Sequence, residues 1–282
     1  LMQFLIVILL FFVSLPLSAK NAIPIVAQQH IYDDYLCLVK GREIKTINEY
    51  GGKCARREVT EVLLIQQILA LGGFDYDFEL EPGYYAQKDV KLLKSGMLLI
   101  GVDSFWSSQA KSLQKDVYIT PALIEKGTYV AGLYTVEKNV KALSASTEQE
   151  IKKLSIISSK TWPVDWQLIQ SLGFKNISHE VSWMTQAKLM KSKLVDIMLI
   201  PFSNEEDKSY VFLQTKFVPI PNIKISFPEG RHVLISKKHP LGKQAYEAFL
   251  KGMKIMKEKG AIEKAFNQSG LTREDVKDWP SL

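Results

Sequence analysis

The chain has 282 residues, 46% of them hydrophobic, and 36 Lys and Arg against 30 Asp and Glu give a formal net charge of +6. This is the composition of an ordinary globular protein and excludes a disordered or collagen-like chain, while the length allows one large domain or two smaller ones. The lysines lie on predicted helix faces without interleaved aromatic residues or a recognisable nucleic-acid motif, so we expect a solvated basic surface and no nucleic-acid partner.

The first 19 residues, LMQFLIVILLFFVSLPLSA, carry no charge, and their apolar run ends at Pro16 before Leu-Ser-Ala. An apolar run followed by small residues is typical of a secretory signal peptide and its cleavage site. Because no Lys or Arg precedes the run, an uncleaved anchor or a misassigned start stays open as an alternative. The run is too short, and too interrupted by proline, to be a comfortable membrane span, which favours cleavage after Ala19 and export of the mature chain.

The sequence then alternates apolar strands with helices. The residues between 22 and 103 predict a strand, a helix, a strand, a helix and a strand, over 22–29, 57–73, 74–81, 84–96 and 97–103. This βαβαβ order predicts a mostly parallel sheet covered by helices.

Cys37 and Cys54 are the two cysteines of the chain. In an exported protein a close, even pair favours a disulfide over two free thiols. Neither a second cysteine pair nor a histidine flanks them at the spacing of a zinc site, and the four histidines are scattered. We therefore expect a Cys37–Cys54 disulfide, no metal and no cofactor.

A second series of alternating elements follows an extended passage over 118–136. Its predicted helices and strands are 147–154, 155–159, 162–173, 176–182, 183–193 and 194–202. A proline-rich extended passage leads to residues 231–240, and a helix is predicted over 241–259. In that last helix a stripe of apolar residues predicts the buried face: Ala245, Phe249, Met253 and Met256.

The repeated pattern predicts a two-lobed α/β protein with two extended crossings and a ligand cleft between the lobes. We expect lobe 1 to comprise 20–133 and 232–282, and lobe 2 to comprise 134–231. Open α/β sheets bind ligands outside the carboxyl ends of their strands, which is where such a cleft lies.

Four segments, in this order and spacing, resemble the bacterial periplasmic solute-binding proteins of the type II fold, nearest in layout to those for polar amino acids. The segments are LLKSGMLLIGVD, YITPAL, KLMKSKLVDIMLIPF and HPLGKQAYEAFLKGMKIMKEKGAIEKAFNQSG. The resemblance covers nearly all of the mature chain and implies the two-lobed fold, a cleft and hinge closure on a ligand. It also implies structural roles for Asp103 and Asp196.

Two departures from that family concern the ligand. In amino-acid binders an arginine before the Pro-Tyr corner holds the ligand carboxylate, and here SSQAKSLQKDVY offers only Lys111 and Lys115. Lysine does not replace the bidentate arginine fork. The family's amine-binding carboxylate would follow the VDIML strand, where this chain has Pro201 and Phe202. We therefore expect standard α-amino acids to bind weakly.

The predicted ligand contacts lie at strand exits or helix starts. On the first lobe they are Tyr32, Trp106 and Lys111, and on the second lobe Thr161, Trp162 and Phe202. Aromatic rings there can stack on a flat ligand, and a hydroxyl at a helix start can hold an anion or a carbonyl. The alternatives are that the tryptophans pack within their own lobes and that Thr161 belongs to a plain helix cap.

These observations predict a monomeric, non-enzymatic binding protein for a small-molecule ligand, working with an ABC transporter permease or a membrane sensor. The alternative is an exported enzyme on the same fold, such as a periplasmic dehydratase. That enzyme would need paired acid and base groups in the cleft, and the sequence does not bring such a pair together. An adhesion module is disfavoured by the two-lobed design.

Overall fold

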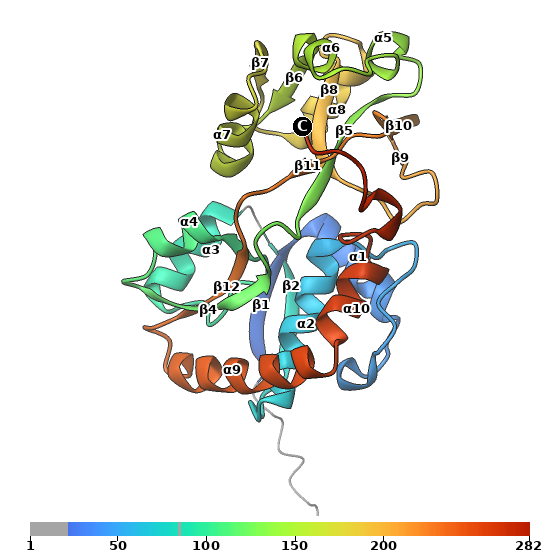
Figure 1. Ribbon diagram of the computed structural model, residues 1–282. Coiled ribbons are helices and arrows are strands. Elements are labelled where there is room, and N and C mark those ends of the chain that lie inside the picture. The colour runs from blue at the N-terminus through green and yellow to red at the C-terminus, as the bar shows by residue number, and fades with distance from the viewer. Residues whose placement is uncertain (1–21, 84–85) are drawn as a thin grey trace, which may run out of the picture.

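The computed structural model describes residues 22–83 and 86–282, arranged as two lobes, one above the other in Figure 1. The predicted signal peptide over 1–19 lies outside the described residues. Within the described ranges, no helix combines the length and apolarity that a membrane crossing would require.

The first lobe contains the first nine regular elements of the described residues, and the chain returns to it near the C-terminus. These elements are β1 Ile23–Gln28, α1 Gln29–Val39, the 3-10 turn η1 Ile44–Thr46, α2 Arg57–Leu71, β2 Phe78–Gly83, α3 Ala86–Ser95, β3 Phe105–Trp106, α4 Ser107–Ser112, β4 Val117–Ile124, β12 Arg231–Ser236, α9 Gly242–Glu258 and α10 Ala261–Gln268. β1 and β2 pair in parallel, and β12 lies antiparallel between β3 and β4.

The second lobe is built on one seven-stranded sheet in the order β7-β6-β8-β5-β10-β9, with β11 also paired to β5. Its elements are β5 Val130–Val136, α5 Val140–Leu143, α6 Glu148–Lys153, β6 Ser155–Ser158, α7 Pro163–Ser171, β7 Asn176–His179, α8 Trp183–Lys191, β8 Ile197–Pro201, β9 Tyr210–Phe212, β10 Thr215–Pro219 and β11 Ile225–Ser226. A short 3-10 turn, η2 Glu274–Val276, follows α10.

The predicted two-lobed α/β class is confirmed, whereas the sheets are less parallel than the βαβαβ pattern predicts. β6 is parallel to β7 and β8, but β5 and β12, which carry the chain between the lobes, pair antiparallel with their neighbours. A crossing strand enters a lobe from the opposite end, so it runs against the strands of the local βαβ unit.

Two local predictions differ from the structure. The segment 97–103, predicted as a strand, contributes a single bridge between Ile100 and Ile235, although its residues Leu98 to Val102 are buried. No helix is predicted from the sequence where the structure has α1. In this helix Ile31, Tyr35 and Leu38 form a buried face with helical spacing. Four polar residues at its start obscured that spacing.

Two segments cross between the lobes, 125–129 from β4 to β5 and 227–230 from β11 to β12 (Figure 1). The packing differs from the predicted lobe boundaries at two places. β5 belongs to the second sheet from Val130 onward, and the C-terminal residues Val276 and Trp279 pack in the second lobe's apolar cluster. The remainder of the predicted division stays a prediction.

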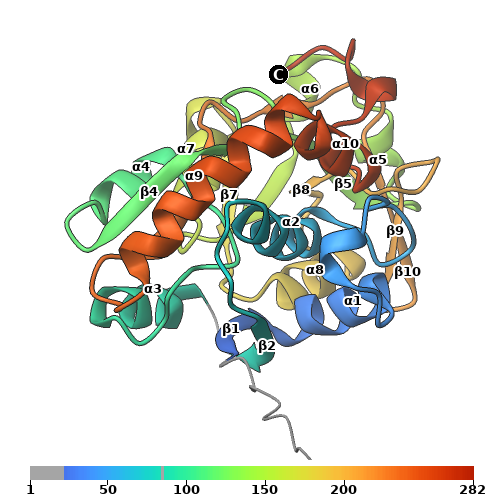
Figure 2. The same cartoon turned by 90° about the horizontal axis from the view of Figure 1, so that it is seen from below.

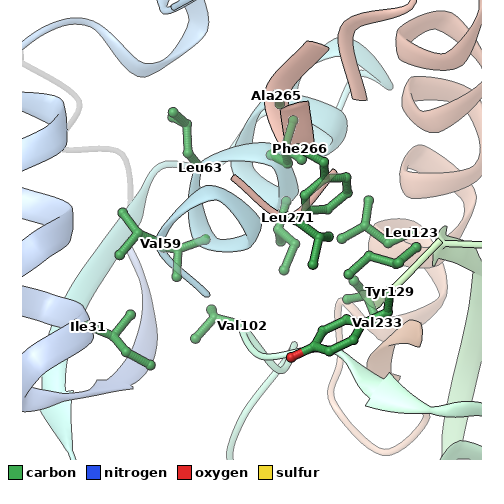
Figure 3. Packing of buried hydrophobic residues seen from close by; sticks show 14 of the residues in the cluster. Ile31, Val59, Leu63, Val102, Leu123, Tyr129, Val233, Ala265, Phe266 and Leu271 are labelled. Carbon is green, nitrogen blue, oxygen red and sulfur yellow. The ribbon is translucent and has the colours of Figure 1, made fainter. Parts of the chain in front are cut away.

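The first lobe's core is centred on α2, which is buried along nearly its whole length between α1 and α9 (Figure 2). Side chains from both ends of the chain meet there, since Val59 and Leu63 share the cluster with Ala265 and Phe266 (Figure 3). A Cβ atom on Gly252 would lie 1.7 Å from the Ile68 carbonyl oxygen, so only glycine permits this approach of α9 to α2.

The predicted buried stripe of the last long helix is confirmed, because Ala245, Phe249, Met253 and Met256 are each at most 3% exposed. That helix ends at Glu258, and Gly260, with φ of 64°, is the N-cap residue directly before α10. The left-handed backbone at Gly260 lets the chain turn from α9 directly into α10.

The predicted disulfide is present in the structure. It joins Cys37 in α1 to Cys54 ahead of α2, with the two Cα atoms 6.0 Å apart. The bridge therefore holds the start of α2 against α1.

Removing the disulfide by the double substitution Cys37→Ser and Cys54→Ser is expected to lower the free energy of unfolding by about 3 kcal/mol. The bridge closes a loop in the unfolded chain and so lowers the conformational entropy that the unfolded chain gains. Urea unfolding of the oxidised protein, the reduced protein and the double variant measures this. The reduced protein and the variant should share one midpoint. Equal midpoints for the oxidised and reduced proteins would contradict the expectation.

Candidate functional site

A cluster of charged side chains lies where the first lobe faces the second. Arg57, in the first turn of α2, is 8% exposed and is held by three carboxylates. Its Nη1 donates to Glu61 Oε1 at 3.0 Å and to Asp103 Oδ1 at 3.0 Å, and its Nη2 donates to Glu58 Oε1 at 2.8 Å. Such pairing offsets the cost of burying the guanidinium.

Arg231, the first residue of β12, completes the cluster from the other end of the chain. Its Nε donates to Ser104 Oγ at 2.8 Å, and its Nη2 donates to the Ser104 carbonyl oxygen and lies 3.4 Å from Asp103 Oδ1. Glu61, which is fully buried, accepts from the Ser104 backbone N–H at 2.9 Å and from Ser104 Oγ at 2.7 Å. Three distant segments of sequence thus share one hydrogen-bonded network.

The carboxylates of this cluster differ in their proton affinity. Burial disfavours the ionised form of Glu58, but Arg57 and Arg56 outweigh it and lower the pKa of Glu58 to about 2. Burial raises the pKa of Glu61, and Arg57 and Arg231 oppose that rise. Glu58 is therefore ionised at neutral pH.

The open side of the cluster presents carboxylates. The side chains of Asp103 and Glu58 are 37% and 25% exposed, whereas each guanidinium side chain is 8% exposed. A molecule that approaches the cluster from solvent therefore meets negative charge first.

Aromatic rings cover the cluster at the crossing between the lobes. Tyr129, at the end of the first crossing, lies with its ring centroid 5.7 Å from the Arg57 guanidinium and 5.8 Å from that of Arg231. Trp106 stacks on Phe227 at 4.7 Å, and the Arg231 guanidinium lies 4.4 Å from the Trp106 ring centroid. Both crossings, through Tyr129 and Phe227, are thus packed against the charged cluster.

Asp165, in the first turn of α7, brings a charge from the second lobe to the same place. Burial raises the pKa of Asp165 to about 6, and the opposing effects come from Arg231 and Arg57 of the first lobe. The charges of two first-lobe guanidiniums therefore act on a carboxyl group of the second lobe.

Replacing Asp165 by asparagine is expected to stabilise the protein at pH 7. Folding raises the pKa of Asp165 from 3.8 to about 6, so the folded protein binds this proton more tightly than the unfolded chain does. The resulting gain in the free energy of unfolding is complete below pH 3.8 and is lost as the pH rises through about 6. Asparagine cannot ionise, so the variant's gain should grow across this window to at most about 3 kcal/mol. Thermal unfolding between pH 4 and 8 measures it, with the exposed Glu247→Gln as control; a gain independent of pH would contradict it.

A small pocket of about 20 Å³ lies beside the cluster at the carboxyl end of β1, room for about one water molecule. Its polar lining comes from Gln28, Glu58, Asp89 and Asp103, and its apolar lining from Val26, Ala27, Ile31, Val62 and Val102. The pocket therefore continues the acidic surface of the cluster into the first lobe.

A larger cavity of about 490 Å³ lies elsewhere between the lobes, next to the C-terminal residues. Its lining is polar and includes Lys53, Asn204, Gln268 and Arg273. None of the residues that line it belongs to the charged cluster. Over residues 22–83 and 86–282, no group of His, Cys, Asp or Glu side chains could hold a metal ion.

On the first lobe, the predicted contacts lie at different depths. Tyr32 is half-buried on α1, and Lys111 is exposed on α4. Trp106 is 5% exposed, and its ring packs against Phe227 and the Arg231 guanidinium. Their roles as ligand contacts stay predictions.

On the second lobe, Thr161 is exposed and Trp162 is half-buried, both just before α7 and near Asp165. The Thr161 hydroxyl lies 2.8 Å from Ser159 Oγ and does not cap the helix. Phe202 is 3% exposed and lies 6.3 Å from Tyr134 and 5.6 Å from Trp279 between ring centroids. The structure thus brings Thr161 and Trp162 together and places Phe202 in the second lobe's apolar cluster.

The sequence analysis did not identify the charged cluster. Arg57, Glu58 and Glu61 lie in a segment whose apolar periodicity predicts only a buried helix face. Arg231 lies at the start of a strand, far from them in the sequence, so no local pattern links the four residues. One signal was present: a helix that is buried on most sides should not begin with Arg-Glu-x-x-Glu unless those charges have partners.

Comparison with known proteins gives a fold. No family model and no curated protein matches the chain. Among solved structures, the probable amino-acid ABC transporter extracellular-binding protein ytmK from Bacillus subtilis is 14% identical with a TM-score of 0.55, covering 76% of this chain and 88% of that one.

Two further structures have similar scores. An amino acid ABC transporter substrate-binding protein from Streptococcus pneumoniae, bound to L-arginine, is 14% identical with a TM-score of 0.51 over 74% of this chain and 84% of its own. The periplasmic VFT2 domain of BvgS from Bordetella pertussis is 10% identical with a TM-score of 0.52 over 74% and 82%. The chain therefore has the two-lobed α/β fold of the type II periplasmic solute-binding proteins.

Proposed function

We propose that the protein is a periplasmic, non-enzymatic solute-binding protein whose lobes close on a small polar ligand at the charged cluster. The observation that carries the proposal is that the charges of Arg231 and Arg57 from the first lobe act on the pKa of Asp165 from the second. Charges buried between two lobes are costly unless they are paired, so a ligand with complementary groups would favour the closed form.

The ligand that fits this surface carries a positively charged or strongly hydrogen-bond-donating group. Glu58 and Asp103 are the more exposed charges of the cluster, at 25% and 37%, whereas the Arg57 side chain that they hold is 8% exposed. Where amino-acid binders have an arginine that holds the ligand carboxylate, this chain has the exposed Lys111. Lysine cannot form the two parallel hydrogen bonds of an arginine, which supports weak binding of standard α-amino acids. An amine or guanidine without an obligatory α-carboxylate fits best.

The partner is a membrane protein, either an ABC transporter permease or a membrane sensor. Structural neighbours include binding proteins of amino-acid ABC transporters, which supports the first of these. Export by the predicted signal peptide would place the mature chain where either partner could be reached.

A thermal-shift screen of the mature protein tests the proposal. Small amines, guanidines, the standard amino acids and neutral sugars form the panel, and a ligand at 100 times its dissociation constant should add about 2.7 kcal/mol of stability. We expect the amines and guanidines to contain the compounds that stabilise the protein. Stabilisation by sugars alone, or by no compound of the panel, would contradict the proposal.

One observation favours the alternative of an exported enzyme. Asp165, with a pKa of about 6, is a carboxylic acid able to exchange a proton near neutral pH within the cleft. Incubating the stabilising compound with the protein and analysing it by mass spectrometry separates the two functions. A binding protein returns the compound unchanged, whereas an enzyme such as a dehydratase releases a product.

A further inference from the structure

The C-terminal residues 272–282, here called the strap, connect the two lobes a third time. Leu271, just before the strap, packs beside Phe266 in the first lobe's core (Figure 3). Val276 is fully buried in the second lobe's apolar cluster. In Figure 1 the red chain rises from α10 and ends beside β11. The chain thus passes from one core to the other within five residue steps, a reach of at most about 18 Å.

Charged groups fasten the strap to the loop that follows β8. Arg273 Nη1 donates to the carbonyl oxygens of Ser203 at 2.5 Å and Glu205 at 2.9 Å. Arg273 also forms a bidentate pair with Asp275 at 2.8 Å, and Lys208 Nζ lies 2.7 Å from the same carboxylate. Arg273 and Lys208 hold the pKa of Asp275 well below its usual range, although burial opposes them.

Apolar and backbone contacts fasten the end of the strap. The Trp279 ring meets Phe202 edge-on at 5.6 Å, and Lys208 Nζ lies 5.5 Å from the Trp279 ring centroid. The Lys224 backbone N–H donates to the Pro280 carbonyl oxygen at 3.0 Å, and the Leu282 N–H donates to the Lys224 carbonyl oxygen at 3.0 Å. With this many contacts to the second lobe, the strap should move with that lobe.

The strap begins where a second-lobe side chain touches the first lobe. Asn204 Nδ2 donates to the Ala55 carbonyl oxygen at 3.0 Å. A Cβ atom on Gly270 would lie 2.1 Å from Asn204 Oδ1, so Asn204 is seated directly against the backbone of the first lobe. This edge of the interface is therefore held by side-chain contact as well as by the covalent connection.

We propose that the strap limits how far the lobes open, a conformational role that goes beyond ligand binding but rests on the lobe movement proposed above. Two crossings alone permit hinge bending and twisting. A third short connection, anchored in both cores, can follow only those movements that keep Leu271 and Val276 within reach. The unliganded protein is consequently held near its closed form, and releasing the strap should populate open forms and weaken ligand binding in proportion.

Distance measurement by electron spin resonance tests the strap. Spin labels are placed at two exposed positions through Lys153→Cys on α6 and Lys251→Cys on α9, with the native disulfide left intact. Arg273→Ala removes the polar anchor, and Trp279→Ala removes the aromatic one. Lys277→Ala is the matched control, because the exposed Lys277 side chain pairs only at 3.4 Å with the equally exposed Glu274.

Without ligand, Arg273→Ala and Trp279→Ala should shift the distribution of distances between the labels to longer and broader values, whereas Lys277→Ala should match the unsubstituted protein. A distribution that stays unchanged in a folded Arg273→Ala protein would overturn the proposal. If Trp279→Ala fails to fold, Arg273→Ala alone decides, because Arg273 is partly exposed and outside the core. Failure of the proposed function has a separate signature, namely that no compound of the thermal-shift panel stabilises the unsubstituted protein.

Discussion

Replacing Glu61 by alanine is expected to lower the free energy of unfolding by about 3–5 kcal/mol, because a buried charge then loses its partner. Glu61 is 0% exposed and accepts hydrogen bonds from Arg57, from the Ser104 backbone N–H and from the Ser104 hydroxyl. Arg57 would retain Glu58 and Asp103 as partners. Both carboxylates are more exposed than Glu61, so they neutralise the Arg57 charge less effectively.

Urea unfolding at pH 7 measures this loss, and Glu61→Gln separates charge from hydrogen bonding. The glutamine keeps an acceptor oxygen for Ser104 but no charge for Arg57, so it should fall between the alanine variant and the unsubstituted protein. Glu247→Gln, on the exposed face of α9, serves as control for the loss of a carboxylate. A loss below about 1 kcal/mol for Glu61→Ala, as for a surface substitution, would show that the network does not hold the first lobe together.

The substitution Trp106→Ala is also expected to cost about 3–5 kcal/mol, the range found for truncating large core aromatics. The Trp106 ring is 5% exposed and packs against Phe227 and the Arg231 guanidinium, with Tyr129 edge-on at 5.1 Å. Removing the ring opens a cavity at the point where both crossings meet the charged cluster. From the sequence Trp106 is predicted to contact the ligand. A buried ring that packs against its neighbours also explains a tryptophan at this position without any ligand.

Trp162→Ala is the matched comparison, because Trp162 is half-buried at the start of α7 and belongs to no core cluster. Unfolding without ligand should show a large loss for Trp106→Ala and a small one for Trp162→Ala. Once a ligand is known, Trp162→Ala should weaken its binding. The opposite pattern, a stable Trp106→Ala protein with impaired binding, would return Trp106 to the ligand site and contradict its role in packing.

Much of the fold follows from local patterns in the sequence. The buried stripe of Ala245, Phe249, Met253 and Met256 has helical spacing, and the close pair of cysteines, together with the predicted export, predicts the disulfide. The direction of the crossing strands does not follow from such patterns, since β12 lies between β3 and β4, far away in sequence. The position of the strap does not follow from such patterns either, because Val276 and Trp279 pack against residues that are far away in sequence.

The candidate site was harder to predict than the fold. Its network joins Arg57 and Glu61 to Ser104 and Arg231, so the partners lie up to 127 positions apart and no short motif contains them. The family resemblance drew attention to Lys111, Pro201 and Phe202, the positions at which amino-acid binders hold their ligand. Phe202 instead packs against Trp279 of the strap, a contact that only the three-dimensional arrangement reveals.

Calorimetric titration of the compound found by the thermal-shift screen tests the closure of both lobes on one ligand most directly. Glu58→Gln alters the first lobe, Asp165→Asn alters the second, and Gln170→Ala, exposed on α7, is the control. We expect each cleft substitution to raise the dissociation constant about tenfold or more, equal to about 1.4 kcal/mol, and the control to bind as the unsubstituted protein does. Unchanged affinity in both cleft variants would contradict a ligand site between the lobes.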